Sequence, residues 1–142
     1  MKKLAMLLLA LCALPGNAAE ITTRVTGFGN DQGSVKFAMF SKSRQGFFPD
    51  KASQADYVAD SVISAGTATI TLHNVPEGEY AVFVYHDSNS NNILDHKWYG
   101  PPLEPFAYHR AFKVKLMPPV FDEVSFQVSD RDMVLDISLQ TF

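Results

Sequence analysis

The sequence has 142 residues, of which 46% are hydrophobic and 19% are charged, and its formal net charge is −3. An acidic chain is a poor partner for nucleic acid, which we exclude. The length suits one domain with its own hydrophobic core. The single cysteine, Cys12, rules out a disulfide framework.

Residues 1–19 have the composition of a secretory signal peptide, with Lys2 and Lys3, then an apolar run, then small residues. We expect cleavage after Ala18 or Ala19, and favour Ala19. The apolar run is shorter than the roughly 20 residues of a spanning helix, and no later segment is a candidate. The sequence therefore predicts a periplasmic or secreted protein without a membrane span.

Cys12 lies inside this segment, so the exported chain would have no thiol. The alternative is a lipoprotein with Cys12 as the lipidated residue, which the bulky Leu11 before it disfavours. Without Lys2 and Lys3, ten basic side chains face 15 acidic ones, and the net charge becomes −5.

The remaining chain reads as all-β, because short runs of alternating or β-branched residues are separated by turn residues and no helical period is visible. Seven strands are predicted, at Ile21–Phe28, Ser34–Phe40, Ser61–Ser64, Thr67–His73, Tyr80–His86, Val124–Val128 and Val134–Leu139. In 67–72, apolar residues alternate with threonines, so one face packs inward. The run 80–85 is apolar on both sides, as in a central strand. We predict a single antiparallel sandwich over residues 20–142, of immunoglobulin-like or prealbumin-like type.

Two long connections remain in this scheme, roughly residues 41–60 and 87–123. The first contains Phe47 and Phe48 beside Pro49. These rings can form a lid tucked over the sandwich or an exposed patch for a partner. We favour the tucked lid, because monomers rarely expose such patches.

The second connection begins with HDSNSNNILD, which has the spacing of a calcium-binding loop. Five ligands fall at its odd positions: Asp87, Asn89, Asn91, the carbonyl of Ile93, and Asp95. Calcium takes six to eight oxygens, and alternate side chains of a coiled loop can supply them. An apolar residue at position eight, here Leu94, would anchor the loop to the core.

Two residues depart from the calcium pattern. Asn92 replaces the glycine at position six, although asparagine also tolerates the left-handed conformation. Trp98 replaces the closing glutamate at position twelve, and Glu104 is the candidate to supply the missing carboxylate. Few carboxylates imply weak affinity, near ~10⁻⁴–10⁻³ M. The alternative is an inert polar loop, since asparagine is common in turns.

The stretch 72–95, followed by YGPPLEP and PPVFDEVSFQV, resembles the bacterial secreted family named domain of unknown function 2141. The resemblance covers nearly all of the expected mature chain. It implies a β-sandwich with this loop, and it leaves the biochemical role open. Its Pro-x-Gly-x-Tyr turn, at 76–80, also looks like that of prealbumin-like and carboxypeptidase-regulatory-like sandwiches. There the tyrosine, here Tyr80, ties down a turn.

Other functional patterns are weaker. The four histidines match no zinc spacing, and we expect His86 to order the loop by hydrogen bonding and His96 to be exposed. No serine lies in a nucleophile elbow. The aromatic stretch 98–108 suits contact with carbohydrate or peptide, or else covers an open end of the sandwich.

The sequence thus predicts a monomeric, non-enzymatic binding or accessory module with calcium at Asp87, Asn89, Asn91, Ile93, Asp95 and Glu104. Its partner would be a protein or a glycan. Two alternatives stay open: a periplasmic hydrolase or glycan-processing enzyme that uses the loop carboxylates, and a structural envelope protein.

Overall fold

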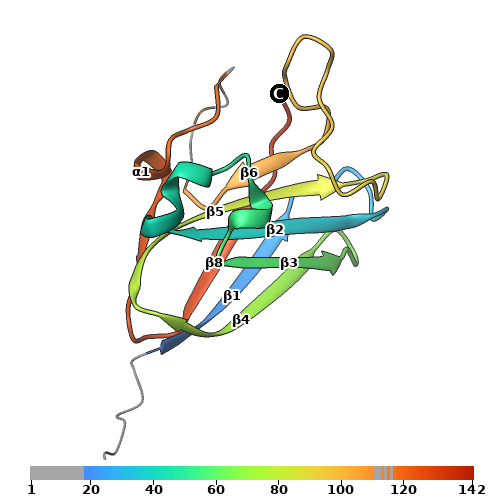
Figure 1. Ribbon diagram of the computed structural model, residues 1–142. Coiled ribbons are helices and arrows are strands. Elements are labelled where there is room, and N and C mark those ends of the chain that lie inside the picture. Colours follow the sequence, from blue (N-terminus) through green and yellow to red (C-terminus); the bar gives the residue numbers. More distant parts are fainter. Residues whose placement is uncertain (1–17, 111–112, 114, 116) are drawn as a thin grey trace, which may run out of the picture.

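The computed structural model describes residues 18–110, 113, 115 and 117–142. It contains two packed β-sheets with short helical turns on one side (Figure 1). Residues 1–17, with most of the predicted signal peptide and Cys12, lie outside the described residues. The elements are β1 (Ala18–Thr26), β2 (Ser34–Ser41), η1 (Lys42–Phe47), η2 (Ala52–Gln54), β3 (Tyr57–Val62), β4 (Ala68–Pro76), β5 (Gly78–Asp87), β6 (Phe106–Tyr108), α1 (Phe121–Val124), β7 (Phe126–Val128) and β8 (Met133–Ser138).

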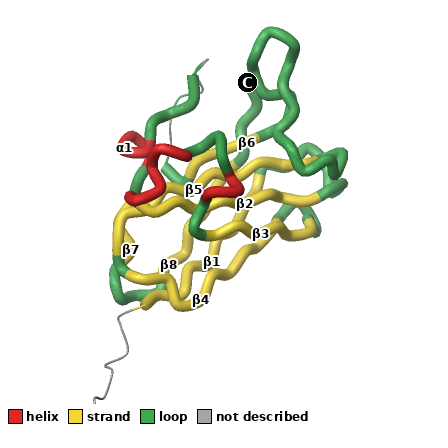
Figure 2. Tube along the Cα trace, in the orientation of Figure 1, coloured by secondary structure: helices red, strands yellow, loops and turns green. Residues whose placement is uncertain are grey.

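The predicted all-β sandwich is confirmed, with eight strands in the described chain instead of seven. One sheet has the order β4-β1-β8, and the other has the order β3-β2-β5-β6, with β7 also paired to β5. Figure 2 shows the two layers. The expectation of purely antiparallel strands needs one correction, because β1 and β8 run parallel, from Ile21 opposite Met133 to Thr26 opposite Ser138. Because these two strands are far apart in the sequence, no turn motif between them predicts the pairing.

The main core lies between the sheets and is built from alternate residues of their strands. A second apolar cluster lies on the outer face of the five-stranded sheet. The central strand β5 contributes to both, because Val82 and Val84 face the main core while Phe83 and Tyr85 face outward into the second cluster. This explains why the run 80–85 is apolar on both sides.

Three regions differ most from the elements predicted from the sequence. β3 occupies 57–62 instead of 61–64, as the edge neighbour of β2. β6 is a new strand of three residues, held by its pairing with β5. Residues 121–124 form one helical turn, where the predicted strand began at Val124. Phe121 and Val124 are both buried, and the Glu123 carboxylate accepts the Val120 N–H at 3.1 Å.

Residues 42–56, which we call the lid, cross the outer face of the five-stranded sheet. Phe48 is buried there against Phe40, Tyr108 and Phe121, with ring centroids 5.4, 5.6 and 6.0 Å away. The tucked arrangement expected from the sequence is confirmed.

The turn at 76–80 also has the expected structure. The Tyr80 hydroxyl donates to the Pro76 carbonyl at 3.0 Å, so this tyrosine ties the β4–β5 turn together. Beside this turn, Ala18 and Ala19 of β1 lie opposite Pro76 and Val75 of β4. β1 therefore begins before the expected cleavage site.

Candidate functional site

The polar loop, by which we mean residues 87–96, starts where β5 ends, at the buried Asp87. One carboxylate oxygen of Asp87 accepts the Asn91 N–H at 3.1 Å, and the other accepts the Asn92 N–H at 2.9 Å. Asn92 has a φ of +63°. This is the left-handed conformation expected at position six, where asparagine substitutes for glycine. Asp87 thus folds the first turn of the loop over its own carboxylate.

The outer half of the loop is organised around Asp95. The side-chain amide of Asn89 donates to Asp95 at 2.6 Å, and that of Asn91 donates at 2.9 and 3.0 Å to its two oxygens. The amide oxygens of Asn89 and Asn91 accept the N–H groups of Asn91 and Ile93. Each asparagine therefore links a backbone turn to the Asp95 carboxylate.

Glu104 is distant in sequence and closes the base of the loop. Its buried carboxylate accepts the Ser88 N–H at 3.0 Å and the Ser88 hydroxyl at 3.2 Å through one oxygen. The other oxygen accepts the Asp95 N–H at 3.1 Å. The structure thus brings Glu104 to the loop, where the sequence sought a missing carboxylate.

Sequence reasoning missed Lys36. Its ammonium lies 3.9 Å from the buried Asp87 carboxylate and 3.3 Å from the exposed Asp60. Lys36 comes from β2, which is antiparallel to β5 with Ser34 opposite Asp87. Only the strand register places a lysine here, so no motif within the loop could have indicated it.

A second contact from outside the loop comes from the β1–β2 turn. The His86 Nε2 atom lies 2.6 Å from the Gln32 carbonyl, and its ring is edge-on to Phe28. A side chain on Gly33, which has a φ of +70°, would place its Cβ 2.0 Å from the Asp87 carbonyl. Glycine is required for this approach. The His86 ring therefore contacts the β1–β2 turn, whereas we expected from the sequence that its hydrogen bond would order the polar loop.

The carboxylates of the loop act electrostatically on Tyr85, on the outer face of β5. Burial, and then the negative charges of Asp87, Glu104 and Asp95, raise the pKa of Tyr85 to about 12. The phenol therefore stays neutral and can donate a hydrogen bond at physiological pH.

The loop offers carboxylate, amide and carbonyl oxygens, the types that calcium prefers. Among the described residues, no three acidic, histidine or cysteine side chains gather as a metal-holding group. Both oxygens of Asp87 and both of Glu104 already accept hydrogen bonds from the protein. The oxygens of Asp95, Asn89 and Asn91 likewise accept hydrogen bonds within the loop, so an ion bound here would replace some of these contacts. Leu94 is partly buried against the outer apolar cluster, as expected for position eight.

The histidines have separate surroundings. His73 lies 2.9 Å from the Glu20 carboxylate, His86 contacts Gln32, and the exposed His96 lies on the polar loop. His109 packs against Phe126 with ring centroids 4.6 Å apart. Burial, and then the nearby Arg110 charge, lower the pKa of His109.

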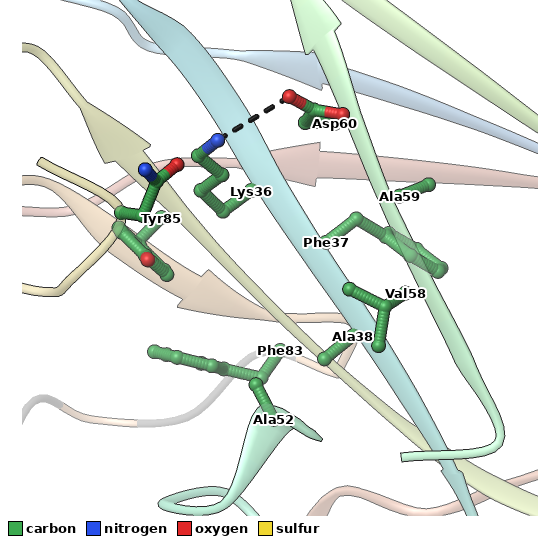
Figure 3. A pocket seen from close by; sticks show the side chains of 10 residues that line it. Lys36, Phe37, Ala38, Ala52, Val58, Ala59, Asp60, Phe83 and Tyr85 are labelled. Carbon is green, nitrogen blue, oxygen red and sulfur yellow. Dashed lines mark hydrogen bonds and ion pairs between the residues drawn. The ribbon is translucent and has the colours of Figure 1, made fainter. Parts of the chain in front are cut away.

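A cavity of about 390 Å³ lies between the polar loop and the lid. Its sheet side is aromatic, formed by Phe83, Tyr85, Phe106 and Tyr108. The polar loop and the residues after it contribute Asn92, Ile93, Leu94, His96, Gly100 and Pro102, and the lid contributes Pro49, Asp50 and Ala52. Lys115, Met117 and Pro118 complete the lining. A neighbouring cavity of about 290 Å³ shares Ala52, Phe83, Tyr85 and Asn92 and extends to Lys36 and Asp60 (Figure 3). Together they form a groove across the outer face of the sheet.

The aromatic stretch 98–108 divides into two parts. Phe106 and Tyr108 are buried, but on the outer face of the five-stranded sheet and not over an open end of the sandwich, as one interpretation of the sequence expected. Trp98 and Tyr99 are exposed, as the other interpretation expected. The boundary between the two parts is Glu104, whose carboxylate holds the base of the loop.

No helix in the described part of the chain is long and apolar enough to span a membrane. A search of curated proteins finds no match. Among solved structures, the chain is similar to a cysteine-to-alanine mutant of the pilus-presented adhesin Spy0125 (Cpa), with 14% identity and a TM-score of 0.30. That match covers 91% of this chain and 28% of the adhesin chain.

The Pro-x-Gly-x-Tyr turn, the polar loop and most of the sandwich lie within residues 23–136. The model of a family described as uncharacterised proteins conserved in bacteria (DUF2141) matches this same range. The resemblance drawn from the sequence is confirmed, and the chain belongs to this family.

Proposed function

We propose that the protein is an exported, non-enzymatic binding module whose aromatic groove receives an apolar side chain of a protein partner. One observation carries the proposal: loop residues 92–94 and 96 line the same cavity as the four aromatic rings of the sheet. A change in the loop therefore changes a wall of the groove.

The lining favours a peptide over a glycan. Four aromatic rings contribute most of the sheet side, while polar groups such as Asn92, His96 and Asp50 come from the loop and the lid. A sugar buried in this cavity would need polar partners for its many hydroxyls, whereas an aromatic or aliphatic side chain needs apolar contact alone. A few polar groups at the edge suffice to orient the peptide backbone.

Calcium is the second part of the proposal. An ion held by Asp95, Asn89 and Asn91, with Asp87, Glu104 and the Ile93 carbonyl completing the site, would neutralise the loop carboxylates. It would also fix the wall of the groove. The supporting features are the calcium-type spacing, the left-handed Asn92 and the approach of Glu104. Binding stabilises the folded state by mass action once free calcium exceeds its dissociation constant.

Isothermal titration of calcium into the chelator-stripped protein tests the ion site. We expect weak saturable binding that Asp95→Asn reduces and that Asp87→Ala/Asp95→Ala abolishes. Asp130→Ala, at an exposed turn residue, should leave it unchanged. Magnesium and zinc serve as competing ions. Absence of heat with calcium, in a protein that circular dichroism shows to be folded, would refute the ion site.

The groove is tested separately, by NMR titration with N-acetyl-tryptophanamide and with chitobiose. We expect the aromatic amide to perturb resonances of Phe83, Tyr85 and Leu94, and the disaccharide to perturb none of them. Ala52→Leu adds bulk where both cavities meet and should remove the effect. Binding of the disaccharide alone would reverse the choice between peptide and glycan.

A further inference from the structure

Residues 95–103 form a hairpin that projects beyond the sandwich (Figure 1), and we call it the tip hairpin. Its backbone is paired internally. The Leu103 N–H donates to the Asp95 carbonyl at 2.7 Å, the Lys97 N–H to the Pro101 carbonyl at 2.7 Å, and the Gly100 N–H to the Lys97 carbonyl at 2.9 Å. The tip hairpin is therefore a protrusion held by three backbone hydrogen bonds of its own.

The side chains of the tip hairpin are unusually apolar for an exposed turn. Trp98 is 95% exposed, and Tyr99 and Leu103 are each 58% exposed. The Trp98 and Tyr99 rings meet edge to face, with centroids 5.3 Å apart. Large aromatic side chains are normally buried for most of their surface. Their grouping at the end of a protrusion marks an interaction surface.

The charges of the tip hairpin are also sorted. Its flanking carboxylates turn inward: Asp95 accepts the amides of Asn89 and Asn91, and Glu104, just beyond its end, is buried beneath Ser88. The outer ionisable side chains are His96, which is exposed, and Lys97, whose ammonium lies 5.6 Å from the Tyr99 ring centroid. A protein with a net negative charge thus presents a neutral-to-basic tip.

We propose that the tip hairpin docks the protein onto the surface of a lipid bilayer. Tryptophan and tyrosine prefer the interface between headgroups and acyl chains, and lysine beside them can contact anionic phosphates. The three backbone hydrogen bonds within the hairpin reduce the cost of moving it into this layer. Trp98 and Tyr99, which carry the proposal, belong neither to the groove lining nor to the proposed ion site.

The chain offers its own probe, because Trp98 is its only tryptophan. The experiment follows intrinsic fluorescence of the full protein during titration with vesicles of phosphatidylethanolamine and phosphatidylglycerol, up to millimolar lipid. Parallel titrations use phosphatidylcholine vesicles and vesicles with brominated acyl chains. We expect a blue shift of the emission and quenching by the brominated lipids, both stronger with anionic vesicles.

Vesicle co-sedimentation then tests the residues. Trp98→Ala should lower partitioning at least about tenfold, since an interfacial aromatic ring is a large share of the apolar contact. Val62→Ala, at an exposed valine on edge strand β3, is the matched control and should partition as the original protein does. Lys97→Glu should weaken binding to anionic vesicles and leave phosphatidylcholine binding nearly unchanged.

Three results would overturn the proposal. The first is a folded protein whose emission is the same with every vesicle composition. The second is a shift produced by peptidoglycan fragments or by a protein partner but by no vesicle. Equal loss of partitioning in Trp98→Ala and Val62→Ala would likewise assign binding to a different surface.

Discussion

The lid and the polar loop are both long connections on the outer side of the five-stranded sheet, but they are held in opposite ways. The lid is fixed by apolar burial, since Phe48 inserts among Phe40, Tyr108 and Phe121. The polar loop is fixed by carboxylates that accept backbone N–H groups, chiefly Asp87 and Glu104. Apolar burial is insensitive to ions and pH, whereas a carboxylate-centred loop can respond to both. The lid side and the loop side of the groove therefore differ in the conditions that can change their conformation.

The largest expected effect is at the lid. Phe48→Ala should lower the free energy of unfolding by about 3 kcal/mol, through lost burial and a cavity against three rings. Urea denaturation measures the change. Phe47→Ala, at the neighbouring half-buried ring, is the matched control and should cost clearly less. Equal losses at both positions would mean that Phe48 is no special anchor, and the comparison of the two connections would fail.

The corresponding substitution in the loop is Asp87→Ala. It leaves two backbone N–H groups without their acceptor and removes one of the two carboxylates beside the Lys36 ammonium, so we expect a loss of about 2 kcal/mol in urea denaturation. Asp60→Ala removes the exposed partner of the same lysine and should change stability far less. A neutral Asp87→Ala would show that the loop does not depend on its first carboxylate.

Lys36 sharpens the comparison, because it supplies a positive charge where calcium is proposed to bind. Lys36→Met should raise calcium affinity several-fold, since it removes repulsion between the ammonium and the ion. Calorimetric titration gives the affinity, and Lys51→Met on the lid serves as the control for overall charge. Unchanged affinity in Lys36→Met would place any bound ion away from Asp87.

The smallest effect concerns Tyr85, whose pKa of about 12 is set first by burial and then by the loop carboxylates. A pKa raised in the folded state gives stability that is complete below the unfolded value of about 10 and is lost as pH rises toward 12. Alkaline unfolding should thus be partly relieved in Tyr85→Phe.

Calcium bound beside Asp87 and Asp95 would counter the negative charges and lower the pKa of Tyr85. Ultraviolet titration of tyrosinate, with calcium and with chelator, measures this shift, and Tyr85→Phe identifies the phenol responsible. Identical titration curves in the two conditions would count against an ion in the loop.

Much of the fold could be predicted from local patterns. The alternation in 67–72 placed one strand face in the core, and the run 80–85 predicted a central strand. Asn92 was expected to take the left-handed conformation, and its φ of +63° agrees. These features depend on neighbours in sequence, namely side-chain alternation and backbone preference, so a short window contains the information that they need.

Tertiary structure decided the rest. The parallel pairing of β1 with β8, the strand β6 and the approach of Lys36 to Asp87 all depend on contacts between residues far apart in sequence. The groove also depends on contacts between distant residues, because the sheet, the lid and the polar loop all contribute to its lining. By itself the sequence determined a sandwich and a loop rich in oxygen ligands. Which side chains meet at that loop follows from strand register, because register selects partners that no local pattern names.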